Sequence, residues 1–111
     1  MGFKNEMAEK RALVDDWLDR LIPPQTQYPQ VIYEAMRYSV FVGGKRLRPV
    51  MLIAVCEMLG GDISRALPFA CAIEMIHTYS LIHDDLPALD NDDSRRGRLT
   101  SHKQFGEATA L

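Results

Sequence analysis

The sequence predicts an all-α fold, and three observations lead to that prediction. In several segments apolar residues recur at steps of three and four, as they do along one face of an amphipathic helix. Glycine or proline pairs separate these segments at residues 23–24, 43–44 and 60–61. Runs that alternate apolar and polar residues between turns are missing, so no convincing strand is expected.

The first two helices are expected over residues 3–22 and from Pro29 to Phe41. The apolar face of the first consists of Phe3, Met7, Val14, Trp17, Leu18, Leu21 and Ile22. The prolines at 23–24 should end it, because proline lacks a backbone donor and disfavours a helical conformation in the residue before it. Pro29 suits the first position of the second helix, which the glycines at 43–44 should stop.

A third helix is expected to open at Pro49 and to close at the glycines 60–61. Its residues are apolar almost all round, which predicts a buried helix. After the acidic segment described below, a further helix is expected to begin, capped by Thr100 or Ser101.

A fourth helix is expected to be capped by Asp62 or Ser64, to carry Pro68 near its first turns and to continue through Ile82.

Composition bounds the functional classes. The 111 residues are 47% hydrophobic and 25% charged, which is ordinary for one globular domain. The net charge of −2 favours neither nucleic acid nor an anionic membrane as a partner. Cys56 and Cys71 lie inside apolar runs without metal-type spacing, so we expect a reduced, cytoplasmic protein. No segment approaches the ~20 apolar residues that span a bilayer, and no secretory leader is expected.

Residues 80–97, SLIHDDLPALDNDDSRRG, hold five aspartates directly ahead of two arginines. Carboxylates at this density repel one another unless a cation lies between them, and Mg²⁺ prefers oxygen ligands supplied by one or two carboxylates, waters and phosphates. A metal held by Asp84 and Asp90 would leave positions for a diphosphate, which Arg95 or Arg96 could bind as a fork. The segment therefore predicts a metal and diphosphate site.

This segment has two alternative interpretations. Aspartate clusters are common in solvated turns, where their side chains bond the local backbone. A calcium-binding EF-hand loop needs glycine at its sixth position and glutamate at its twelfth. Counted from Asp84, those positions hold Leu89 and Arg95, so an EF-hand is excluded.

Helical geometry relates His77 to Asp84 but not Asp84 to Asp90. A separation of seven residues is close to two turns, so His77 and Asp84 share a face. Six residues correspond to roughly 240° of rotation, and Pro87 should break the hydrogen-bond ladder in between. If both aspartates bind one metal, a bulge or loop must therefore bring Asp90 back toward it.

A second cluster, GGKRLRP at residues 43–49, places three cations between two helices. Glycines permit close approach, and the following helix N-terminus favours an anion. Lys45 would act as a point charge and Arg48 as a fork, whereas Arg46 need not face the same ligand. A solvated basic turn is the alternative. Together, the two clusters suggest two phosphorylated substrates or one long one.

These motifs, DDLPALD, NDDSRRG, HTYSLIH and GGKRLRP, resemble those of the trans-isoprenyl diphosphate synthases (polyprenyl synthetases) from about Tyr33 to Leu111. Within the family the chain looks most like bacterial farnesyl diphosphate synthases. The resemblance implies the N-terminal part of an isoprenoid synthase helical bundle, with residues 1–111 forming part of one domain. It also implies Mg²⁺ as cofactor, diphosphate substrates and a homodimer.

The resemblance also implies residue roles. Asp84 and Asp90 correspond to metal ligands supported by Asp85, and Arg95 corresponds to the residue that grips the allylic diphosphate. Four residues correspond to the isopentenyl diphosphate site: Lys45, Arg48, His77 and Arg96. On its own helix, His77 would otherwise be interpreted as a packed core histidine.

The implied reaction condenses dimethylallyl or geranyl diphosphate with isopentenyl diphosphate to give farnesyl diphosphate. In this family an aromatic residue five positions before the first motif aspartate, here Tyr79, accompanies short products. The alternatives are a geranylgeranyl diphosphate synthase, a non-catalytic diphosphate-binding partner subunit, or a structural helical domain. A second aspartate-rich motif lies far downstream in the family, so we expect an N-terminal fragment that alone is weakly active or inactive.

Overall fold

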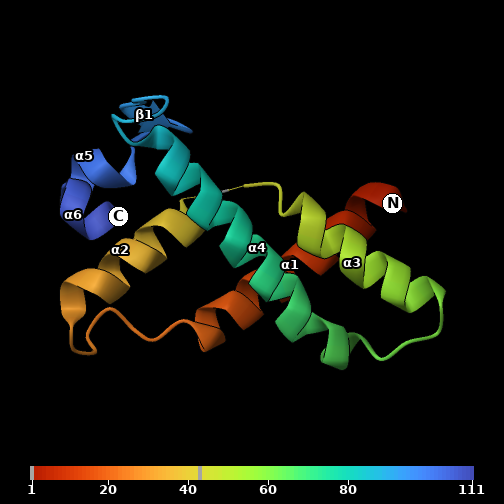
Figure 1. Cartoon of the computed structure of the whole chain (residues 1–111). Coiled ribbons are helices and arrows are strands. Elements are labelled where there is room, and N and C mark those ends of the chain that lie inside the picture. The colour runs from red at the N-terminus through yellow and green to blue at the C-terminus, as the bar shows by residue number, and fades with distance from the viewer. Residues whose placement is uncertain (1, 43) are drawn as a thin grey trace. The chain divides into compact units, whose positions relative to one another are not determined.

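A computed structural model describes residues 2–42 and 44–111. Its secondary-structure elements (Figure 1) are α1 (Phe3–Leu21), α2 (Gln30–Phe41), α3 (Leu47–Met58), α4 (Ile63–Asp85), β1 (Ser94–Arg95), β2 (Arg98–Leu99), α5 (Ser101–Phe105) and α6 (Glu107–Ala110). The fold is mostly helical, as the sequence predicts. None of the helices in the described part of the chain is both long and apolar enough to cross a membrane.

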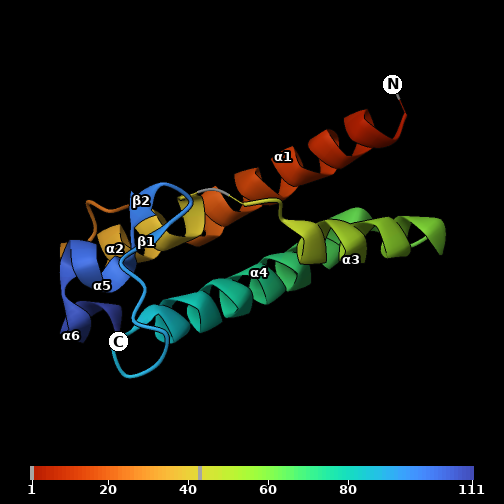
Figure 2. The same ribbon diagram turned by 90° about the horizontal axis from the view of Figure 1, so that it is seen from above.

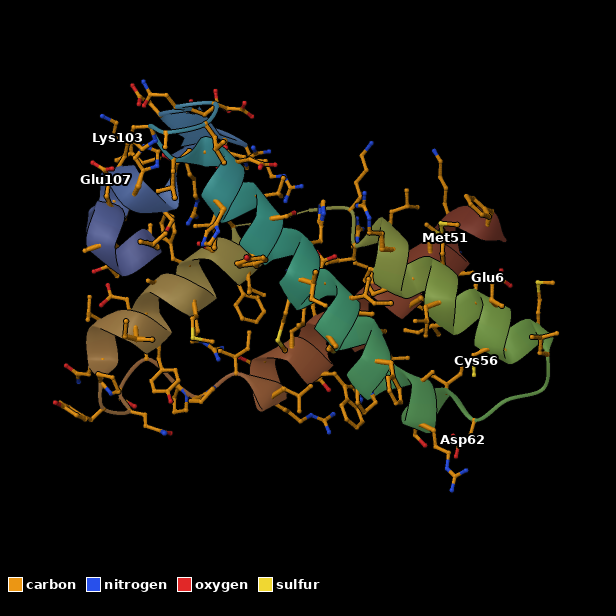
Figure 3. All side chains as sticks on the ribbon, in the orientation of Figure 1. Glu6, Met51, Cys56, Asp62, Lys103 and Glu107 are labelled. Carbon is orange, nitrogen blue, oxygen red and sulfur yellow. The ribbon has the colours of Figure 1, made fainter. Side chains whose placement is uncertain are left out.

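The helix ends follow the expected turn chemistry. α1 stops at Leu21, ahead of the two prolines, and Pro29 occupies the position before α2. Asp62 rather than Ser64 caps α4, because its Oδ1 accepts from the backbone N–H of Ser64 at 3.0 Å and from the Ser64 hydroxyl at 2.7 Å. Figure 3 shows Asp62 in the turn just ahead of α4.

The expectation that the chain has no strand is wrong at residues 94–99. β1 and β2 pair antiparallel, with Ser94 opposite Leu99 and Arg95 opposite Arg98. Arg96 and Gly97 form the two-residue turn with φ of 54° and 75°, which matches the left-handed pair that tight hairpins require. Strands of two residues are too short to leave an alternating pattern in the sequence.

The expectation that α3 is buried all round is also wrong. Val50 and Ile53 are buried, but Met51 is 56%, Val55 51% and Met58 83% exposed. α3 packs against α1, and packing against a neighbour buries the face of a helix that meets it, leaving apolar residues on other faces exposed. Figure 3 shows Met51 among the side chains of α3.

The chain divides into two compact units. The first comprises residues up to Leu21 together with Lys45–Met75, and the second comprises Ile22–Gly44 and Ile76–Leu111. α4 contributes its beginning to the first unit and its end to the second. The buried apolar residues of the first unit are Val14, Leu18, Val50, Ile53, Leu67, Ala70 and Cys71, and those of the second are Ile22, Ala35 and Val40.

Within the second unit, α5 and α6 contact α2 (Figure 2). The ring of Tyr38 on α2 meets the ring of Phe105 on α5 edge-on, with 5.2 Å between centroids. The Tyr38 hydroxyl donates to the carbonyl of Leu99 at 2.6 Å. α2 therefore supports the hairpin and the segment that follows it.

Candidate functional site

The acidic loop, residues 84–93, begins where α4 ends. The helix stops at Asp85, two residues before Pro87, which could not extend it. The chain then reverses: the backbone N–H of Asp90 donates to the carbonyl of Asp84 at 2.8 Å, and that of Asp92 donates to the carbonyl of Asp85 at 3.1 Å. The loop therefore brings the backbone of Asp90 back to that of Asp84, which a metal shared by the two side chains would require.

Asp84 and Asp90 are both exposed at this crossing. Among the described residues, no group of three or more histidine, cysteine or acidic side chains is arranged to hold a metal. Two exposed carboxylates on adjoining backbone nonetheless suit Mg²⁺, which commonly takes one or two protein carboxylates and completes its shell with water and phosphate oxygens. The donor set fits Mg²⁺ shared with a diphosphate and does not fit a closed protein cage.

Asp85 has a different environment from Asp84 and Asp90. It is only 3% exposed, and its carboxylate faces Arg95. The Arg95 guanidinium donates from Nε to Oδ2 at 3.0 Å and from Nη2 to Oδ1 at 2.7 Å, a two-pronged contact. These hydrogen bonds raise the pKa of Arg95, and partial burial offsets part of that effect. Arg95 is therefore a fixed cation at the edge of the acidic loop, and Asp85 orients it.

Further contacts close the acidic loop onto the hairpin. The Thr100 hydroxyl donates to the carbonyl of Asp92 at 2.9 Å, and the Thr100 backbone N–H donates to the carbonyl of Asp93 at 3.0 Å. Lys103, on α5 (Figure 3), lies 3.5 Å from the carboxylate of Asp93. Thr100 occupies the N-cap position of α5, but its side chain holds the acidic loop and does not cap the helix.

Arg96, in the hairpin turn, lies against Gly44. A Cβ at position 44 would be 2.5 Å from Nη1 of Arg96. The sequence analysis expected glycine here to let an anion approach the backbone. In the second unit it is the Arg96 guanidinium that approaches, and Gly44 directly precedes Lys45 in the chain.

The cationic segment, residues 44–49, continues into the first unit. Lys45 and Arg48 are exposed, whereas Arg46 between them is only 5% exposed. Arg46 contacts Asp15 of α1 at 2.8 Å and Glu74 of α4 at 2.7 Å. The sequence reasoning missed both partners; the isolated acid within the apolar run CAIEMI was the available signal for Glu74.

The remaining predicted residues lie on α4 within the second unit. His77 is half-buried, and its carbonyl accepts from the Ser80 hydroxyl at 2.7 Å. Tyr79 is exposed, and its ring lies 4.4 Å from that of His83. Of the four residues expected to bind isopentenyl diphosphate, Lys45 and Arg48 belong to the first unit. The other two, His77 and Arg96, belong to the second.

Comparison with known proteins identifies the family. Residues 29–111 match the family model described as polyprenyl synthetase. The chain is 56% identical over 109 residues to heterodimeric geranylgeranyl pyrophosphate synthase large subunit 1 of Arabidopsis thaliana, covering 98% of this chain and 29% of that protein. It is 53% identical to a dimethylallyltranstransferase of Fischerella ambigua, covering 95% of this chain and 30% of that protein.

Solved structures agree in fold. An FPP/GFPP synthase from Zymomonas mobilis matches with a TM-score of 0.89 at 44% identity, over 96% of this chain and 38% of that one. A geranyltranstransferase from Thermotoga maritima matches with a TM-score of 0.89 at 41% identity, over 95% of this chain and 39% of that one. The chain spans about 30% of the length of the curated relatives just named.

Proposed function

Because the chain belongs to the polyprenyl synthetase family, we propose that it supplies part of the active site of a prenyltransferase that joins an allylic diphosphate to isopentenyl diphosphate. The observation that carries this proposal is the return of Asp90 to Asp84 beside an arginine that Asp85 holds in place. Two exposed carboxylates and a fixed guanidinium together match a Mg²⁺-bound diphosphate.

The residues act on the leaving group. Asp84 and Asp90 would hold Mg²⁺, which supplies charge neutralisation as the allylic carbon–oxygen bond breaks. Arg95, oriented by Asp85, donates to the departing diphosphate and stabilises the negative charge that develops there. Lys45, Arg48, His77 and Arg96 are proposed to bind isopentenyl diphosphate. Its double bond attacks the allylic carbon as the carbon–oxygen bond breaks, and the resulting cation loses a proton to the released diphosphate to give the longer allylic product.

We propose farnesyl diphosphate as the product, on the basis of Tyr79 five positions before Asp84. A C20 product is the second candidate, because relatives with more than half of their aligned residues identical are named geranylgeranyl pyrophosphate synthases. Product analysis of the whole enzyme by chromatography separates the two, and a Tyr79→Ala variant that lengthens the product would assign the role to this residue.

A cytoplasmic homodimer is proposed for the whole protein, from the composition and the resemblance. A non-catalytic diphosphate-binding subunit is the competing assignment; it predicts pyrophosphate binding without turnover even in the whole protein.

The binding half of the proposal can be tested on this chain with Mg²⁺ and inorganic pyrophosphate. A ligand that binds only the folded state raises stability, by about 2.7 kcal/mol at a concentration of 100 times Kd. We expect this stabilisation in thermal unfolding of the wild-type chain, and we expect an Asp84→Ala/Asp90→Ala variant to lose the part of it that requires Mg²⁺. Asp16→Ala, at an exposed aspartate of α1, is the control. No stabilisation of the wild type, or equal stabilisation of the double variant, would contradict the proposal.

A further inference from the structure

Arg46 has an unusual backbone for its residue type. It is the N-cap residue of α3 and adopts the left-handed conformation, with φ of 54° and ψ of 34°. A residue with a Cβ disfavours this conformation, so surrounding contacts must hold it there. Residues held in this way often serve a functional site.

Two ion pairs, one buried and one partly buried, supply those contacts. Nε of Arg46 donates to Oδ1 of Asp15 at 2.8 Å, and Nη1 donates to Oε2 of Glu74 at 2.7 Å. Glu74 is itself only 5% exposed. Because Asp15 belongs to α1 and Glu74 to α4, two helices of the first unit fix the side chain that begins a third.

The fixed arginine determines how the cationic segment starts α3. The carbonyl of Arg46 accepts from the backbone N–H of Val50 at 3.0 Å, which forms the first turn. With the middle cation turned inward, Lys45 and Arg48 on either side of it remain exposed at the helix N-terminus.

We propose that Arg46 and Glu74, with Asp15, are positioning residues that hold Lys45 and Arg48 in the geometry that binds isopentenyl diphosphate. This inference rests on the proposed function, which assigns Lys45 and Arg48 to that substrate. Without the ion pairs, Arg46 is no longer held in the left-handed conformation, and Lys45 and Arg48 adopt several orientations. Affinity for a diphosphate then falls although neither binding residue has changed.

A purely structural role predicts something different. Buried ion pairs often add little net stability compared with well-packed apolar residues, although removing one partner is harmful. If the cluster only stabilises the fold, its loss lowers the unfolding temperature. Pyrophosphate affinity then stays the same wherever the chain is still folded.

The experiment is calorimetric titration of the 111-residue chain with inorganic pyrophosphate, without divalent metal, at a temperature where circular dichroism shows each variant folded. Glu74→Gln keeps the shape and removes the charge. Asp15→Asn removes the charge of the other, partly exposed partner of Arg46. It replaces Glu74→Gln in the experiment if that variant does not fold. Asp16→Asn on the same helix is the matched control, and Lys45→Ala/Arg48→Ala removes the proposed ligands.

We expect Glu74→Gln to weaken pyrophosphate binding on the order of tenfold, because the released Lys45 and Arg48 side chains must then be ordered when the ligand binds. Asp15→Asn should weaken it less, and Asp16→Asn should leave it unchanged. Hydrogen exchange at the Val50 amide should quicken in the first variant. If Lys45→Ala/Arg48→Ala lowers pyrophosphate affinity but Glu74→Gln and Asp15→Asn do not, the positioning role is wrong and the assignment of Lys45 and Arg48 as ligands stands. If Lys45→Ala/Arg48→Ala has no effect, the proposed ligand assignment fails as well.

Discussion

At the residue scale, Asp85 differs from the other aspartates of the acidic loop because it alone is buried. Its two oxygens face Arg95, so its contribution to the site passes through that arginine. The sequence presented five similar aspartates. The structure distinguishes the exposed pair, Asp84 and Asp90, from the one that orients a cation.

Asp85→Asn should lower the free energy of unfolding by about 1.5–3 kcal/mol, the usual worth of a hydrogen bond to a charged group. Urea unfolding measures this change. Asp93→Asn is the control, because the exposed contact between Asp93 and Lys103 should contribute about 1 kcal/mol or less. Equal effects of the two substitutions would mean that the Arg95 fork does not stabilise the loop.

Gly44→Ala should displace the Arg96 guanidinium, since the new Cβ would lie 2.5 Å from its Nη1. The end of an arginine side chain moves easily, but Gly44 has a φ of 157°, which a residue with a Cβ rarely adopts, so the free energy of unfolding should fall by about 1–3 kcal/mol. Pyrophosphate affinity should fall, because Arg96 would leave its place in the proposed site. In an Arg96→Ala background, Gly44→Ala should not lower pyrophosphate affinity any further. An equal loss of affinity with and without Arg96 would show that Gly44→Ala does not act through this arginine.

Burial raises the pKa of the Cys71 thiol above its ordinary value of 9.0, and the charge of Arg46 opposes this only in part. The unfolded chain therefore releases this proton at a lower pH than the folded chain. Stability from the neutral thiol is fully present below pH 9.0 and is lost as pH rises from there through the folded pKa.

Urea unfolding at about pH 8 and about pH 10, on either side of the ordinary thiol pKa, tests this effect. Cys71→Ala should lower the free energy of unfolding at both pH values. Between about pH 8 and about pH 10 its free energy of unfolding should fall by less than that of the wild type. Cys56→Ala is the control and should retain the wild-type difference between the two pH values. A Cys71→Ala difference as large as that of the wild type would show that the Cys71 thiol does not contribute.

At the element scale, α3 shows that the pattern of apolar residues can predict a helix without predicting which of its faces are buried. Its apolar residues predicted a helix correctly, but burial depends on what lies against each face. Val50 and Ile53 are buried, whereas Met51 and Val55 are not. A composition that is apolar all round does not say which neighbours a helix has.

Ile53→Ala should cost about 2–5 kcal/mol, because the removed atoms leave a cavity in the core of the first unit. Val55→Ala, on the exposed face of the same helix, should stay within about 0.5 kcal/mol of the wild type. Chemical unfolding of both variants gives the comparison. Comparable losses would indicate that α3 is buried on both faces in solution.

At the scale of the whole molecule, the chain supplies about 30% of the length of its curated relatives. Its described residues include the Asp84–Asp90 pair but no third ligand grouped with them. The prediction that residues 1–111 form part of one domain stays a prediction, since the chain divides into two compact units.

We expect the 111-residue chain to bind Mg²⁺ and pyrophosphate without steady turnover of dimethylallyl and isopentenyl diphosphates. Diphosphate departure needs clustered positive charge, and the resemblance assigns part of the metal-binding set to a downstream motif. A product assay with purified chain measures this, with the whole enzyme as positive control. Many turnovers per chain would contradict the expectation.

Local rules in the sequence were sufficient to locate the four long helices and the proline stop after α4. Each depends on backbone chemistry between near neighbours: the helical repeat, the missing donor of proline and the caps supplied by Asp62 and glycine. The family resemblance, carried by closely spaced motifs, is confirmed by the match over residues 29–111.

Only the tertiary structure decided which charged groups are partners. Arg46 is 31 residues from Asp15 and 28 from Glu74, and neither separation follows from a local repeat. The same holds for Gly44 and Arg96, and for the burial of Asp85 among exposed aspartates. Long-range pairing depends on how helices pack, which fixes the surroundings of a side chain and so determines whether a charge is buried or left free to meet a ligand.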